Sequence, residues 1–238
     1  MRRAVDPATL VVCATLPQAL RRAACGQLID GLGSGPMATW AADADTLAAV
    51  TEVVRSRGGA GPELAAVIQP AWLDSRVTLR RMIAAARQAA GVETAVLRGP
   101  RPLAHHAVLA EEGIRVVAVD TPAAADRGSR RPAPAGWRCR NPVWGLWEVQ
   151  VDPPARAGIL GWLMHGSMPR LRRGALHVLH AGGVPAERPV SGRLERWLAW
   201  AGRRQAGGRV RTVGLSELPA LVARAGQPPV SGSVLKAA

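Results

Sequence analysis

His177 and His180 are the side chains of this sequence best suited to acid–base chemistry, because imidazole titrates near neutral pH. They lie in the apolar segment 176–180, which is typical of a buried strand. Positions three apart on a strand point to opposite faces, so the two rings are not expected to line one pocket.

A second pair, His105 and His106, opens a predicted helix over residues 102–112. Adjacent side chains on a helix diverge by about 100°, which makes a shared metal ion geometrically unfavourable. We expect both histidines to be exposed to solvent.

Three aspartates follow predicted strands and could act with His180 as general acids or bases: Asp43, Asp74 and Asp120. Such groups work together only if they reach a common substrate atom. Asp120 could instead cap the turn that begins at Thr121.

Cys13, Cys25 and Cys139 are too widely spaced to form a zinc motif or a disulfide framework, and we expect buried, inert thiols. The sequence has no phosphate-binding glycine motif in a strand–helix context. The glycines of Gly31-Leu32-Gly33-Ser34-Gly35 follow a predicted helix, which is the wrong context.

Short apolar segments alternate along the chain with longer amphipathic ones, and the apolar ones predict strands of a parallel sheet. The predicted strands are 10–14, 37–40, 64–68, 94–97, 115–119, 147–151, 176–180 and 210–213. The predicted helices are 17–32, 44–57, 75–90, 102–112, 156–173 and 190–206, with caps expected at Asp45-Thr46 and Ser75 and a stop at Gly91. This alternation predicts an α/β fold, either a barrel or a doubly wound sheet.

The chain is expected to form one domain over residues 1–226, followed by a flexible tail at 227–238. Residues 121–143 are rich in Pro, Arg and Gly and predict a long loop, which is unusual inside a compact domain.

Five segments, in chain order, resemble motifs of the polysaccharide deacetylase (NodB-homology) family. Pro36-Met37-Ala38-Thr39-Trp40-Ala41 is similar to the family's second strand, and Leu97-Arg98-Gly99-Pro100 resembles its Arg-x-Pro motif. The others are Leu109-Ala110-Glu111-Glu112-Gly113-Ile114, Val178-Leu179-His180-Ala181-Gly182 and the closing segment 208–218. The resemblance implies a distorted (β/α)7 barrel of the glycoside hydrolase/deacetylase type.

The family's reaction removes acetyl groups from sugar polymers with a divalent metal held by one aspartate and two histidines, and a second aspartate acts as base. The paired aspartates should follow the first strand, where this chain has Ala14-Thr15-Leu16-Pro17-Gln18. The two histidines should follow the third strand, where it has Gln69-Pro70-Ala71-Trp72-Leu73-Asp74. We therefore predict no metal and no other cofactor.

The resemblance also suggests roles for the residues that remain. Arg98 matches the arginine that orients the catalytic carboxylate, and His180 matches the general acid; with Asp120 they are the candidate catalytic residues. Trp40, Asp74 and Trp144 are candidate ligand-binding residues. Indoles such as Trp144 and its neighbours Trp137 and Trp147 could stack on sugar rings, or could bury the long loop against the domain.

The predicted function is a deacetylase-like protein with impaired catalysis that binds a carbohydrate or a protein partner. One alternative is an active carbohydrate deacetylase or hydrolase with a relocated site. Another is a basic nucleic-acid-binding protein, suggested by a net charge of +14 and a pI near 11.6. The basic residues are spread along the chain, with one tight cluster at Arg127–Arg140, so a nucleic-acid partner is not favoured.

No apolar stretch is long enough to span a membrane, and no secretory leader precedes Pro17, so we expect a cytoplasmic protein without a membrane partner. The sequence predicts no particular substrate or oligomeric state.

Overall fold

The computed structural model describes residues 7–18, 20, 22–32, 38–57, 61–97, 105–119, 139–143, 145–152, 171–183 and 192–225. Its strands are β1 (Ala8–Thr15), β2 (Thr39–Ala42), β3 (Glu63–Ile68), β4 (Thr94–Leu97), β5 (Val116–Val119), β6 (Cys139–Val143), β7 (Leu146–Gln150), β8 (Leu176–Gly183) and β9 (Val210–Thr212). The helices are α1 (Arg22–Leu32), α2 (Ala44–Arg57), α3 (Arg76–Ala90), α4 (His106–Glu111), α6 (Gly192–Ala206) and α7 (Leu218–Ala225), with 3-10 turns η1 (Pro70–Asp74) and η4 (Leu215–Glu217).

The strands form a nearly closed, distorted barrel. Along the order β7-β5-β4-β3-β2-β1-β8, every neighbouring pair is parallel. The amide of Asp152, just past β7, donates to the Val178 carbonyl of β8 at 2.8 Å and brings the two ends of this row together. The prediction of an α/β barrel is confirmed, and the doubly wound alternative is excluded by this contact between the outer strands.

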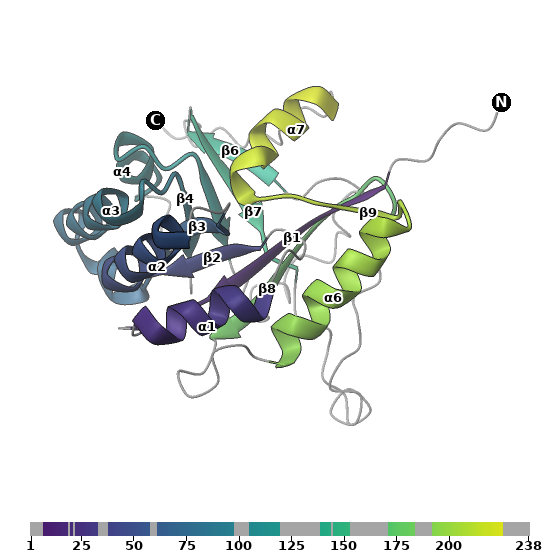
Figure 1. Cartoon of the computed structure of the whole chain (residues 1–238). Coiled ribbons are helices and arrows are strands. Elements are labelled where there is room, and N and C mark those ends of the chain that lie inside the picture. The colour runs from purple at the N-terminus through teal and green to yellow at the C-terminus, as the bar shows by residue number, and fades with distance from the viewer. Residues whose placement is uncertain are drawn as a thin grey trace, which may run out of the picture.

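The helices lie outside the strands, as Figure 1 shows for α1 to α4 on one side and α6 on another. Helices α2 and α3 occupy the predicted ranges to within one residue. The Ser75 hydroxyl accepts from the Thr78 amide at the start of α3. Gly91 ends α3 in the left-handed conformation, with φ of 63°, which favours glycine.

Several predicted boundaries were wrong. Helix α2 is capped by Asp43, whose Oδ1 accepts from the Thr46 amide at 2.9 Å, and not by Asp45-Thr46. Helix α1 begins at Arg22 and not at Pro17, and Gln18 lies in a turn. The predicted helix at 156–173 lies outside the described residues up to 170, and residues 172–175 form a turn closed by the hydrogen bond from the Ala175 amide to the Arg172 carbonyl.

The predicted loop 121–143 ends in a strand that the sequence analysis missed. Strand β6 pairs with β7 in the antiparallel direction. Pro142 within this short segment concealed its strand character.

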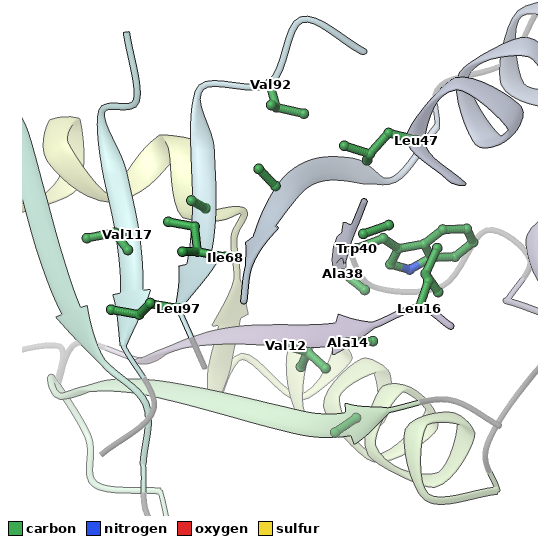
Figure 2. Packing of buried hydrophobic residues seen from close by; sticks show 14 of the residues in the cluster. Val12, Ala14, Leu16, Ala38, Trp40, Leu47, Ile68, Val92, Leu97 and Val117 are labelled. Atoms are coloured by element: carbon green, nitrogen blue, oxygen red, sulfur yellow. The ribbon is translucent and has the colours of Figure 1, made fainter. Parts of the chain in front are cut away.

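Alternate side chains of each strand face two separate apolar layers. The outer layer packs strands against helices and includes Val12, Ala14 and Trp40 (Figure 2). The inner layer fills the barrel with Val, Ala and Cys side chains, such as Val11 and Cys13. Small side chains suit the narrow interior of a closed parallel barrel.

One end of the barrel is covered by η4 and α7. Leu215, Leu218 and Val222 are buried in the inner layer, so the end at which the strands begin is filled with apolar side chains. The opposite end, where the strands finish, is the mouth at which barrel enzymes build their sites. No helix within the described ranges is long and apolar enough to cross a membrane.

Candidate functional site at the barrel mouth

His180 and Thr15 meet at the mouth of the barrel. Thr15 is the last residue of β1, and His180 lies on the adjacent strand β8. The Thr15 hydroxyl and the His180 Nε2 are 2.8 Å apart, which is hydrogen-bonding distance. Thr15 is buried and His180 is half-buried, so the pair lies at the boundary between the apolar interior and solvent.

The barrel interior below this pair is apolar. Cys13 is the register partner of His180 and lies in the inner layer with Val11 and Val178. Complete burial raises the pKa of the Cys13 thiol, with a smaller contribution from the negative charge of Glu63. A thiol with a raised pKa is a poor nucleophile, so Cys13 supplies packing and not chemistry.

His177 points to the other face of β8, as the spacing predicted. Its Nδ1 lies 2.8 Å from Asp152 Oδ2, and its Nε2 accepts from the Arg172 amide at 3.0 Å. Because Nε2 is an acceptor, the ring carries its proton on Nδ1 and donates it to the carboxylate. Both ring nitrogens are thus engaged at the seam between β7 and β8, away from the mouth.

The other predicted site residues do not converge on His180. Trp40 is 1% exposed and packs beside Leu16 and Leu47 between the sheet and the helices, on the face opposite the barrel interior (Figure 2). Asp74 is exposed at the end of η1, and Asp43 caps α2. Arg98, Asp120, Trp144 and Trp137 lie outside the described residues.

The expectation that His105 and His106 are exposed was wrong. His106 is 6% exposed, and its Nε2 lies 3.2 Å from Oε2 of Glu148, a β7 residue that is 1% exposed. His105 Nε2 lies 2.8 Å from the Leu73 carbonyl and therefore donates to it. Both residues border one small apolar cavity, together with side chains such as Ile68 and Leu97. His106 joins the start of α4 to β7, and His105 joins it to η1.

Glu63, at the closed end of the barrel, was not predicted from the sequence as a functional or structural site. Its carboxylate accepts from the hydroxyls of Thr39 at 3.0 Å and Thr94 at 3.2 Å, and from the Ser216 amide at 2.9 Å. Burial raises the pKa of Glu63, and these hydrogen bonds partly oppose the rise. The residue ties three neighbouring strands to η4. A glutamate that opens an apolar strand was the only sequence signal for this role.

The residues at the mouth do not fit the divalent metal that the family resemblance implies. The end of β1 presents the Thr15 hydroxyl in place of a carboxylate, and η1 follows β3 without a histidine. Within the ranges that the structure describes, no three His, Cys, Asp or Glu side chains are grouped as metal ligands. A neutral hydroxyl is a much weaker ligand for a divalent cation than a carboxylate.

Solved structures with the same fold include proteins whose names refer to polysaccharides and glucans. A putative polysaccharide deacetylase from Mycobacterium smegmatis is similar, with a TM-score of 0.58 and 14% identity over 96% of this chain and 94% of that one. A 4-alpha-glucanotransferase from Thermococcus litoralis has a TM-score of 0.52 and 14% identity over 90% of this chain and 38% of that one. An uncharacterized protein from Agrobacterium tumefaciens C58 has a TM-score of 0.51 and 14% identity, with 90% of each chain covered.

No family model matches the sequence, and no curated protein matches it. At 14% identity the similarities establish the fold and nothing further. The chain therefore has a polysaccharide deacetylase-like fold.

Proposed function

We propose that this chain is a deacetylase-like barrel that has lost metal-dependent hydrolysis and binds a carbohydrate at its mouth, through Thr15 and His180. The proposal depends on one observation. A hydroxyl–imidazole pair, 2.8 Å apart, occupies the end of β1, where the family's reaction needs carboxylates. The family's reaction depends on a metal that polarises the acetyl carbonyl and activates water, and neither Thr15 nor His180 supplies the carboxylate that would hold it.

The chemistry of the pair suits sugar hydroxyl groups. A threonine hydroxyl donates one hydrogen bond and accepts others, and a neutral imidazole has one donor and one acceptor nitrogen. The Thr15 hydroxyl and the His180 ring can therefore exchange their mutual hydrogen bond for bonds to a sugar. The layer beneath them, formed by side chains such as Cys13 and Val178, is apolar.

The similar structures support a carbohydrate over a protein as the ligand, since two of their names refer to a polysaccharide and to a glucan. A relocated hydrolytic site has less support. Among the described residues, no hydrogen bond or ion pair joins Asp43 or Asp74 to His180, and Asp43 is engaged at the start of α2.

The proposal is tested by calorimetric titration with a tetramer of β-1,4-linked N-acetylglucosamine. EDTA is included so that binding is measured without a divalent metal. Thr15→Val removes the hydroxyl and keeps the side-chain shape, and we expect it to weaken binding at least tenfold. Thr51→Val is the matched control, because the Thr51 hydroxyl bonds to the Leu47 carbonyl within α2. Equal affinities of the two variants would contradict a role for Thr15.

An acetate-release assay on the same tetramer separates binding from hydrolysis. We expect no acetate above background with Zn²⁺, Co²⁺ or Mg²⁺ added. Metal-dependent release that is lost in His180→Ala would overturn the proposal in favour of an active enzyme.

A further inference from the structure

The end of the barrel opposite the mouth carries a group of arginines that come from two distant parts of the chain. Five exposed arginines lie near the start of β1, and we call them the basic rim: Arg172, Arg173, Arg203, Arg204 and Arg209. The first two precede β8, and the other three surround the turn between α6 and β9.

Backbone hydrogen bonds hold the two parts of the basic rim together. The Thr9 amide donates to the Ala175 carbonyl at 2.9 Å, and the Ala175 amide donates to the Arg172 carbonyl at 3.2 Å. On the other side of β1, the Ala8 amide donates to the Arg209 carbonyl at 3.1 Å, and the Arg209 amide donates to the Arg204 carbonyl at 3.0 Å.

Only strand β1 lies between the arginines that precede β8 and those that surround the turn from α6 to β9. It pairs with β8 along one side and with β9 along the other, in register from Thr9↔Leu176 and Ala8↔Val210. Neighbouring strands lie about 4.8 Å apart, which places the starts of β8 and β9 about 10 Å from each other. Figure 1 shows the start of β1 beside the turn that leads from α6 to β9.

The charges of the basic rim are not neutralised by the described part of the chain. Ion pairs in the described part of the chain include Arg211 with Glu217 and Arg80 with Glu112. None of these ion pairs involves one of the five rim arginines. Arg203 and Arg204 lie in the last turn of α6, where the helix dipole favours a positive charge. The dipole does not account for Arg172, Arg173 or Arg209, and positive charges gathered at one end of the barrel repel one another. A surface of this kind is stabilised by a polyanion.

We propose that the basic rim binds the phosphate backbone of a nucleic-acid duplex. Arginine presents a planar fork of donors that matches phosphate oxygens. Among the described residues, Val77 on α3 is the only large apolar side chain classed as exposed, and no indole is fully exposed for stacking with unpaired bases. Recognition through phosphates, without reading of sequence, is the mode that these side chains support.

Basic residues that are spread along the sequence are thus gathered by the parallel pairing of β8, β1 and β9. The inference does not depend on the proposed carbohydrate site, which lies at the other end of the strands.

Fluorescence anisotropy with a 20-base-pair DNA duplex, over a range of salt concentrations, tests the proposal. The variant is the triple substitution Arg172→Gln, Arg173→Gln and Arg209→Gln. The control has the same loss of charge on other exposed arginines: Arg55→Gln, Arg76→Gln and Arg81→Gln, which lie on α2 and α3. We expect the rim variant to bind at least tenfold more weakly, with a log–log salt slope reduced by about 2.7, since each lost phosphate contact removes about 0.9. The control should keep the wild-type slope.

Three results would overturn the proposal. Equal weakening of both variants would show that net charge alone attracts the duplex. A flat salt response of the wild-type protein would exclude phosphate contacts. Tighter binding to heparin than to the duplex at equal charge concentration would assign the basic rim to an acidic polysaccharide.

Discussion

The Asp152 carboxylate and the His177 imidazole, 2.8 Å apart, lie across the seam at which β7 and β8 complete the barrel. The Asp152 amide donates to the neighbouring Val178 carbonyl, so side chain and backbone of one residue both join the two strands. Side-chain exposures of 13% for His177 and 19% for Asp152 leave the pair largely shielded from water. A shielded hydrogen bond to a charged group contributes more to stability than an exposed one.

Asp152→Ala should lower the free energy of unfolding by about 1.5–3 kcal/mol, because it removes a charge-assisted hydrogen bond and leaves His177 Nδ1 without this acceptor. Urea denaturation followed by circular dichroism measures the loss. Glu52→Ala, which breaks the exposed ion pair with Arg22, is the control and should change stability by less than about 1 kcal/mol. Equal losses of unfolding free energy in the two variants would show that the Asp152–His177 pair stabilises the protein no more than an exposed ion pair does.

Glu63→Gln should change how stability depends on pH. The pKa of Glu63 is raised in the folded protein by burial, so its ionisation costs more folded than unfolded. Its stabilising contribution is complete below the unfolded pKa and is lost as pH rises through the folded pKa. Glutamine cannot ionise, and the Thr39 hydroxyl can rotate to accept from the new amide.

We therefore expect Glu63→Gln to gain stability relative to the wild-type protein as the pH is raised from 4 to 7. Thermal melts across this range measure the difference. A difference that is constant with pH would contradict the raised pKa of Glu63.

Gly91→Ala should destabilise the protein by about 1–2 kcal/mol, because a φ of 63° is unfavourable for a residue with a Cβ. The open space around Gly91 means that the cost comes from the backbone conformation alone. Gly207→Ala is the matched control, since its nearest heavy atoms to an added Cβ are at 3.6 Å, an ordinary contact. Chemical denaturation of both variants should show a loss only for Gly91→Ala.

The three thiols should resist alkylation in the folded protein. Cys13, Cys25 and Cys139 are all buried, and burial raises the pKa of each, that of Cys139 to about 11. The reactive species is the thiolate, which is scarce for all three at pH 8. Mass spectrometry after treatment with iodoacetamide should find modification only once the protein is unfolded. Rapid labelling of Cys13 under native conditions would contradict its placement inside the barrel.

Local signals in the sequence predicted the regular elements well. Ser75 and Gly91 mark the two ends of α3, and the opposite orientations of His177 and His180 follow from strand spacing alone. These features depend on neighbouring residues, whose geometry is fixed by the backbone period.

Contacts between residues far apart in the sequence could not be predicted from these local signals. Closure of the barrel needs the Asp152–Val178 hydrogen bond, and the Glu63 cluster needs Ser216, which is 153 residues away. The burial of His106 depends on Glu148 in another element. None of these pairings leaves a periodic pattern in the sequence. The motifs that resemble the deacetylase family predicted the barrel more successfully than hydrophobic periodicity did, because periodicity alone fits a doubly wound sheet equally well.

We propose that the hydroxyl–imidazole pair of Thr15 and His180 binds carbohydrate at the mouth of the barrel without a metal. The most direct test of this proposal is nuclear magnetic resonance of ¹⁵N-labelled histidine side chains, during titration with the N-acetylglucosamine tetramer in EDTA. We expect the ring signals of His180 to shift with saturation, while those of His177, on the opposite face of β8, stay unchanged. Unperturbed His180 signals, or a shift that appears only after Zn²⁺ is added, would contradict it.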